Sequence, residues 1–441
     1  MRRRDALAGL LGLVGCTSAS GGPSLAVRPP DSSNAGSIAP FAARTFAGLA
    51  THMATNGAGE SVVVGTFDGS IDYGLGEHVA SGPGDIFVVK VDPSGAPIWH
   101  TTVGGEAADQ PRAVTLDDDG AITVLATHDG YSSILSDSVD ARETFLVRLD
   151  AQGQVREQHP LATVGPNAIA RWTDGYAASM VGNGNVGATF SVTWLGPDGM
   201  RTSDTGIAAD RGVVRALATR GDTLAVVGNY GGTMRVGGTT LPVGRDTGFV
   251  ATLAQAGAPH WSRVWRGATV RAAGFAKDGV LVVGGACAAG CAVPSDPDDD
   301  VDGPFVAALD ATGHVLWSRR FPGRFGDGAV SSRATVTSVT IAPDGTVHAV
   351  GPFDGRLDLG DRALDALAST SVFHVALASD GHTVWSGRYP TRSVYAPPVA
   401  TTDAAGHVFV AAGFRGSLDL HTAARHASDT EAGWFFARVT D

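Results

Sequence analysis

The chain repeats a short stretch in which apolar positions alternate behind a phenylalanine. It reads "DIFVVKVDPSGAPIW" at 85–99, "ETFLVRLDAQGQV" at 143–155 and "DGPFVAALDATGHVLW" at 302–317. In each copy the second and fourth positions after the phenylalanine are apolar. This period of two on a branched and aromatic background predicts a β-strand. Seven copies align on Phe87, Phe145, Phe190, Phe249, Phe305, Phe373 and Phe435.

Each copy belongs to a longer repeat that contains four strand-like pieces. In the second repeat these pieces are 112–116, 122–126, 144–149 and 154–159, with turns at "DG" (119–120) and "DAQG" (150–153). Aspartate caps such turns and glycine accepts their positive φ. The aligned phenylalanines lie on average 58 residues apart, 348 residues over six intervals. Four antiparallel strands per repeat predict the blades of a propeller, which must stack in a ring because one blade cannot cover its own faces.

The two ends of the repeat region complement each other. The last repeat stops at "FFARVTD" after its third strand, whereas "PFAARTFAG" (40–48) is similar to the fourth strand "LWSRRFPG" at 316–323. We therefore predict an all-β, seven-bladed β-propeller of four-stranded blades over residues 38–441. Its N-terminal strand is expected to supply the last strand of blade seven and so remove the exposed edges.

A second phrase links the chain to a known group of proteins. "VVVGTFDGSIDYG" (62–74), "HAVGPFDGRLDLG" (348–360) and "FVAAGFRGSLDL" (409–420) precede phenylalanine strands. They resemble the repeats of bacterial β-propeller-repeat lipoproteins and surface proteins over roughly 38–441. The resemblance implies the propeller fold and a place in the cell envelope, and it implies no particular reaction.

The first 37 residues have the composition of an export signal and a tether. Arg2–Arg4 precede the short apolar stretch 6–14, which is too short to span a bilayer. "LVGC" resembles the lipobox of bacterial lipoproteins, which implies that residues 1–16 are a lipoprotein signal and that Cys16 is acylated. The alternative is an ordinary signal with a chance cysteine. Residues 17–37, rich in Gly, Pro and Ser, predict a flexible tether.

The N-terminal segment and the net charge of the chain bear on its location and its partners. By resemblance to Gram-negative lipoproteins, Thr17 rather than Asp after Cys16 implies the outer membrane, reached through the lipid anchor alone. The net charge of −12, with only Lys90 and Lys277 as lysines, argues against nucleic acid as a partner. We expect a monomeric propeller.

Two further cysteines and three aspartates lie in one loop. Cys287 and Cys291 form "CAAGC", for which we predict a disulfide in an exported protein; a redox dithiol would normally have the C-x-x-C spacing. Asp298, Asp300 and Asp302 place alternate carboxylates before Gly303, which makes calcium a candidate ligand. The alternative is a solvated acidic loop without metal.

The connections between the second and third strands of the repeats are long in most blades. In a propeller they gather at one end of the ring, which we call the long-loop face and predict to be the binding surface. The alternative is that they only extend strands and cap blades. These connections are 66–84, 127–142, 229–246, 285–303, 352–370 and 415–433.

Basic residues recur in the predicted innermost strands. Arg112, Arg215 and Arg271 each precede an alanine at the same place, and His52 falls near that place in the first blade. We predict that these residues ring the mouth of the central channel and attract an anion. A purely structural role for this repeated position is the alternative.

Recognisable enzyme motifs are missing from the chain. It has no H-E-x-x-H, G-x-S-x-G, P-loop or dinucleotide fingerprint. The stretch 308–317 is similar to the tryptophan-docking phrase of quinoproteins but is one residue shorter before its glycine, so no quinone cofactor is expected. The sequence thus favours a non-catalytic, lipid-anchored envelope propeller that binds a protein, peptide or glycan through the long-loop face. The alternatives are an envelope carbohydrate-active hydrolase or lyase with carboxylates at the channel mouth, and an outer-membrane assembly scaffold.

Overall fold

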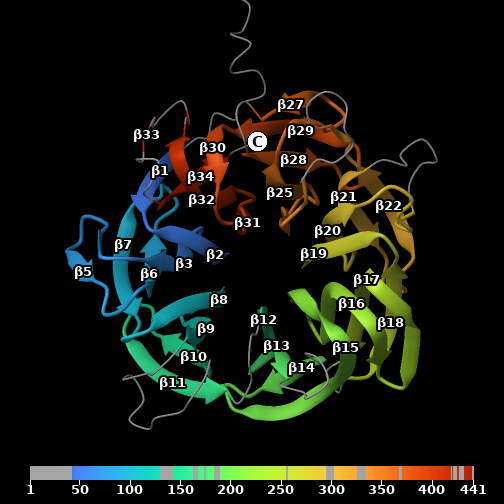
Figure 1. Ribbon diagram of the computed structural model, residues 1–441, viewed down its shortest axis with the longest axis horizontal. Helices are drawn as coiled ribbons and strands as arrows, with labels where there is room; N and C mark the ends of the chain where they lie inside the picture. Colours follow the sequence, from blue (N-terminus) through green and yellow to red (C-terminus); the bar gives the residue numbers. More distant parts are fainter. Residues whose placement is uncertain are drawn as a thin grey trace, which may run out of the picture. The chain divides into compact units, whose positions relative to one another are not determined.

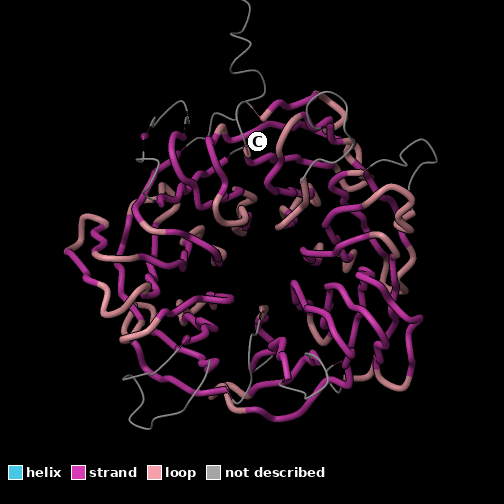
Figure 2. The backbone as a smooth tube through the Cα atoms, viewed as in Figure 1, coloured by secondary structure: helices cyan, strands magenta, loops and turns pink. Residues whose placement is uncertain are grey.

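The computed structural model is an all-β protein, and the predicted propeller fold is confirmed (Figure 1). Residues Gly36–Asp441 form one compact unit. The described chain consists of strands and the loops between them, as Figure 2 shows. The structure describes residues 42–129, 143–161, 167–172, 175–182, 189–254, 257–294, 302–324, 334–366, 370–418, 420, 425–426 and 432–439.

Four of the sheets contain four antiparallel strands in chain order. The first consists of β2 (Leu49–Thr55), β3 (Ser61–Phe67), β6 (Asp85–Val91) and β7 (Pro97–Val103), and the second of β8 (Ala108–Leu116), β9 (Ile122–Asp129), β10 (Glu143–Leu149) and β11 (Val155–Leu161). The other two consist of β19 (Ala268–Phe275), β20 (Leu281–Cys287), β21 (Gly303–Leu309) and β22 (Val315–Arg320), and of β24 (Ser338–Ile341), β25 (Val347–Phe353), β28 (Ser371–Leu377) and β29 (Thr383–Tyr389).

The third and fourth repeats share one sheet of seven strands, which the sequence did not predict. The reason is β15 (Arg201–Arg220), whose 20 residues run without a break from the outer edge of one repeat to the inner edge of the next. Gly206 and Gly212, with φ of 71° and 149°, let the strand bend on the way. The remaining strands of this sheet are β12 (Ile169–Trp172), β13 (Gly175–Gly182), β14 (Thr189–Leu195), β16 (Thr223–Val236), β17 (Thr239–Ala254) and β18 (Pro259–Trp265).

The last sheet joins the two ends of the described chain. β1 (Ala42–Ala47) pairs antiparallel with β34 (Ala432–Val439), from Ala42 opposite Arg438 to Ala47 opposite Gly433. The inner strands of this sheet are β31 (Val399–Thr402) and β32 (Val408–Leu418), and β30 (Thr391–Val394) and β33 (Arg425–His426) add to β32. The N-terminal segment that resembles a fourth strand is thus the neighbour of the last phenylalanine strand.

The inner strands of successive sheets lie side by side around the centre of the ring (Figure 1). β31 contacts β2, so the last and first sheets are neighbours as well. The contacts run in chain order, from β2 to β8, β12, β15, β19, β24 and β31.

Some of the long connections contain small strands of their own. β4 (Ser70–Asp72) and β5 (Glu77–Val79) form a hairpin within 66–84, and β26 (Arg356–Asp358) and β27 (Ala363–Asp365) pair within 352–370 with β23 (Gly323–Arg324) as a third strand. These connections therefore carry strand extensions, in line with the structural alternative for them.

The tryptophan of the repeated stretch joins one sheet to the next through a hydrogen bond. The Trp99 indole of β7 donates a hydrogen bond to the Ala151 carbonyl of the following sheet at 2.9 Å. Trp261 donates in the same way to Ala311 (2.9 Å) and Trp317 to Ser379 (2.7 Å). Each acceptor lies in the D-x-x-G or corresponding turn of the next phrase. The turn glycine faces the indole so closely that a Cβ on Gly153 would lie 2.6 Å from the Trp99 ring.

The contact between the indole and the turn can be tested by adding one methyl group to the turn. Gly153→Ala places a Cβ against the Trp99 ring and also strains a residue with φ of 78°. Gly69→Ala is the matched control, since Gly69 has φ of 71° and no atom within 4 Å of the added Cβ. We expect Gly153→Ala to lower the free energy of unfolding by about 1–3 kcal/mol more than the control does. Equal losses in urea unfolding would show that the indole contact contributes nothing.

Candidate functional site

A cavity of about 700 Å³ lies between the inner strands and brings the four predicted channel residues together. Arg112, Arg215, Arg271 and His52 all line it. Thr66, Asp68, Pro83 and Gly84 line it too, and these belong to the connection between β3 and β6. The cavity therefore lies toward the long-loop face.

A β-bulge presents each of the three arginines. The pairing of β8 with β9 skips Arg112, that of β15 with β16 skips Arg215, and that of β19 with β20 skips Arg271. A bulge inserts one unpaired residue and re-aims its side chain. In β2 the skipped residue is Thr51, so His52, which the sequence placed near this position, is the next residue along.

A glycine in the second strand lets the bulged strand approach closely. A Cβ on Gly228 would lie 2.0 Å from the Val213 carbonyl oxygen, and a Cβ on Gly285 would lie 1.8 Å from that of Thr269. Real Cβ atoms do not come this close, so these positions require glycine. Gly65 faces the Leu49 oxygen of the first sheet at 2.0 Å in the same way. These glycines mark three of the four bulges in the sequence, a signal that sequence analysis missed; at the Arg112 bulge the corresponding residue is Ala126.

The arginines differ in their partners. Arg112 Nε donates a hydrogen bond to Thr127 Oγ1 at 3.0 Å. For Arg215 and Arg271, by contrast, none of the described residues forms a hydrogen bond or an ion pair with the guanidinium, and Arg271 Nε is buried. Partial desolvation lowers the pKa of both side chains, and the charge of Arg271 lowers the pKa of Arg215 further. Arginine nevertheless stays protonated in proteins, so both remain cations.

His52 is held neutral at physiological pH. Burial and, to a lesser degree, the Arg112 charge lower its pKa from the ordinary 6.5 to about 4. Its Nδ1 lies 2.9 Å from the Thr51 hydroxyl oxygen. A histidine with this pKa adds no positive charge to the cavity at pH 7.

Two aspartates, Asp68 and Asp109, also line the cavity. Asp109 is buried, with Oδ1 at 2.6 Å from His128 Nδ1 and Oδ2 accepting the Gly105 amide hydrogen at 3.0 Å. Burial raises the pKa of Asp109, and the contact with His128 opposes this effect. Sequence analysis did not find this pair because its members are 19 residues apart on two strands and form no local motif.

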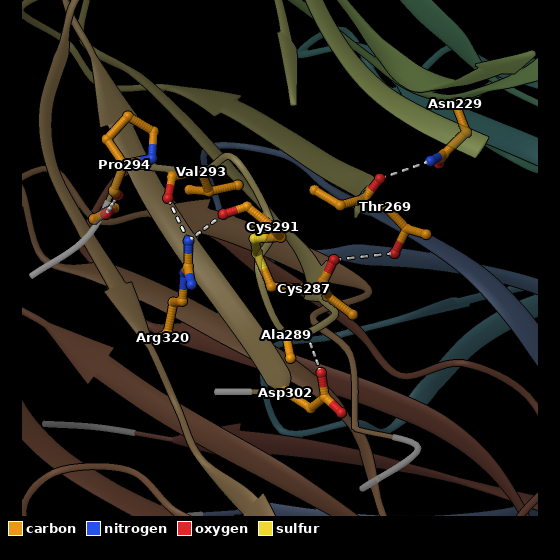
Figure 3. Close-up of a disulfide and its surroundings, with 12 residues drawn as sticks. Asn229, Thr269, Cys287, Ala289, Cys291, Val293, Pro294, Asp302 and Arg320 are labelled. Carbon is orange, nitrogen blue, oxygen red and sulfur yellow. Dashed lines mark hydrogen bonds between the residues drawn. A yellow bond between two sulfur atoms is a disulfide. The ribbon is translucent and has the colours of Figure 1, made fainter. Parts of the chain in front are cut away.

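The other predicted site residues lie away from this cavity or outside the described residues. Cys287 and Cys291 form the predicted disulfide. Around it, Arg320 donates to the Cys291 carbonyl at 2.8 Å, and the Asp302 carboxylate accepts the Ala289 amide hydrogen (Figure 3). Asp302 thus holds the backbone between the two cysteines by a hydrogen bond.

Calcium at the acidic loop stays a prediction. Asp298 and Asp300 lie outside the described residues, as does Cys16. Within the described ranges, no three His, Cys, Asp or Glu side chains are grouped so as to hold a metal ion.

Comparisons with known proteins give distant structural similarities only. No protein-family model and no curated protein matches the chain. Among solved structures, hydrazine synthase of Kuenenia stuttgartiensis is similar with a TM-score of 0.48 and 13% identity, over 83% of this chain and 92% of that one. Sqt1 of Chaetomium thermophilum, bound to the N-terminus of ribosomal protein L10, has a TM-score of 0.42 and 12% identity over 91% of this chain and 100% of its own. The Dos1 propeller has a TM-score of 0.29 and 9% identity, over 86% and 70%.

The low pKa of His52 makes stability depend on pH. Between pH 6.5 and 4 the unfolded chain binds a proton at His52 that the folded protein does not bind. The free energy of unfolding therefore falls as the pH is lowered through this window and reaches its full value above it. Between pH 4 and 6.5 we expect a smaller slope of the free energy of unfolding against pH in His52→Gln than in the wild type. The difference should correspond to the binding of at most one proton. Urea unfolding at several pH values measures this, and parallel curves for the two proteins would contradict it.

Proposed function

We propose that the protein is a lipid-anchored, non-catalytic propeller of the cell envelope, at the outer membrane, that binds a protein, peptide or glycan through its long-loop face. The observation that carries the proposal is the cavity at that face. It has a volume in the usual range for ligand sites and is lined by cationic side chains on the rigid inner strands. A ligand that reaches the long-loop face meets Arg215 and Arg271, whose guanidinium groups have no partner among the residues that the structure describes.

The properties of the titratable groups favour binding over catalysis. His52, with a pKa of about 4, is a poor general base at neutral pH. Asp109 is engaged through both carboxylate oxygens, one with His128 and one with the Gly105 amide. The alternative, a hydrolase or lyase acting on carbohydrate, has in its favour that a second carboxylate, that of Asp68, lines the same cavity. Such an enzyme would lose its reaction in Asp68→Asn.

The binding face can be tested by crosslinking in intact cells. A photoreactive residue at Asp68 lies on the cavity wall at the long-loop face, whereas one at Ser94 lies in the β6–β7 turn at the opposite end of the sheet. We expect a specific envelope adduct from position 68 and none from position 94. Adducts at equal yield from both positions, or from position 94 alone, would contradict the proposed face.

The anchor is proposed from the resemblance of "LVGC" to a lipobox. No helix among the described residues is long and apolar enough to cross a membrane. We expect Cys16→Ser to move the protein from the membrane fraction to the soluble fraction, because several acyl chains are needed for stable anchoring. The variant Cys287→Ser/Cys291→Ser, which removes the other two cysteines, should stay in the membrane fraction. Retention of Cys16→Ser in the membrane would show that the lipobox interpretation is wrong.

A further inference from the structure

Two arginines in the cavity differ from the arginines that serve the fold. Arg263 donates to the Gly313 carbonyl at 2.8 Å, and Arg319 to the Gly381 carbonyl at 2.9 Å, so both help to hold neighbouring sheets together. Arg215 and Arg271 have no such acceptor among the described residues. Arg271 Nε is buried without a hydrogen-bond partner among these residues, and a buried donor without an acceptor costs free energy. Arg215 is exposed at the cavity, where a ligand can reach it.

Arg215 and Arg271, which have no partner in the described part of the chain, lie close to each other in the fold. They occupy the bulges of β15 and β19, which are neighbouring inner strands, and both line the cavity. Their charges repel each other. A bound anion would relieve this repulsion and accept hydrogen bonds from both guanidinium groups. A carboxylate can do so because its two oxygens match the planar donor forks of arginine.

The charge of the whole cavity favours an anion with a single charge. Three arginines and two aspartates line it, and His52 is neutral, which leaves a formal charge of one positive unit. A carboxylate balances this charge. A phosphate group carries about 1.5 to 2 negative charges at pH 7 and would leave an excess.

The rest of the lining favours a peptide over a sugar. No Trp, Tyr or Phe is among the described residues that line the cavity, so the apolar face of a sugar ring would have no aromatic ring to stack on. Polar side chains that can pair with backbone amide groups are present instead, together with small apolar ones. These side chains are Thr51, Gln110, Asn167, Thr337, Pro397 and Pro398.

From these observations we infer that the cavity binds an acidic peptide segment, one of whose carboxylates lies between Arg215 and Arg271. This inference rests on the proposed function, and it names the chemistry of the ligand. Arg112, whose Nε donates a hydrogen bond to Thr127, adds a further positive charge to the same cavity.

The test uses a random dodecapeptide phage library panned on the immobilised full-length protein. We expect the enriched peptides to be rich in Asp and Glu. A synthetic copy should lose at least tenfold in affinity, by fluorescence anisotropy, against Arg215→Gln and against Arg271→Gln. Arg235→Gln is the matched control, because it removes the same charge from an exposed arginine of β16 outside the cavity, and it should change affinity less than twofold.

A change in the peptide keeps the test independent of how the variants fold. Replacing the critical Asp or Glu of the peptide by its amide should weaken binding to the wild-type protein at least tenfold. The same replacement should have little effect on binding to Arg215→Gln/Arg271→Gln, because the two changes remove one interaction. Acetate should displace the peptide better than inorganic phosphate at equal ionic strength.

Several results would overturn the inference. Enriched peptides without acidic residues, or with unchanged affinity for both arginine variants, would show that no carboxylate is held there. Stronger displacement by phosphate would assign a different anion. If no peptide is enriched while position 68 still crosslinks, the peptide assignment is wrong and the binding face stands. If neither experiment gives a result, the proposed function fails as well.

Discussion

The close approach of the first strand to a glycine of the second is the contact on which the centre of this molecule depends. At Gly65, Gly228 and Gly285 a carbonyl oxygen of the inner strand lies only 1.8–2.0 Å from where a Cβ would be. Each of these contacts flanks a bulge in the inner strand. The bulge turns a side chain toward the cavity, and at these three places the missing methyl group gives the bulged strand its room. At the fourth bulge, that of Arg112, the corresponding residue of the second strand is Ala126.

The phrase that recurs along the chain serves the junctions between sheets as well as the strands themselves. Its phenylalanine is buried between sheets: Phe87 packs against Trp434 of the last sheet and Phe305 against Trp265 of the preceding sheet. Its tryptophan and its turn glycine also meet partners in different repeats, as in the contact of Trp99 with the turn at Gly153. A substitution in the phrase therefore alters the packing against a neighbouring repeat. This is a physical reason for the whole phrase to be repeated as a unit.

The fold could be predicted from the sequence because the signals for its strands are local. The alternation behind Phe87 and its counterparts marks strands, and the likeness of 40–48 to 316–323 anticipated the pairing of β1 with β34. Reasoning from the sequence also placed Arg112, Arg215 and Arg271 at equivalent positions. It did not predict that β15 continues from one repeat into the next, because Gly206 and Gly212 look like turn residues and instead bend an unbroken strand. It could not pair Asp109 with His128, since that contact depends on the register of β8 against β9.

The pairing of β1 with β34 has a consequence for the order in which the chain acquires its structure. Ala47 lies opposite Gly433, so β34 is synthesised 386 residues after its partner β1. Sheets formed earlier can pack on one another as they emerge, since domains fold from the N-terminus during synthesis. β1 has to wait with an unpaired edge until β34 has been made, and a contact between residues so far apart in sequence is slow to form. Until then the open edge of β1 can pair with another chain, so this segment needs protection during synthesis.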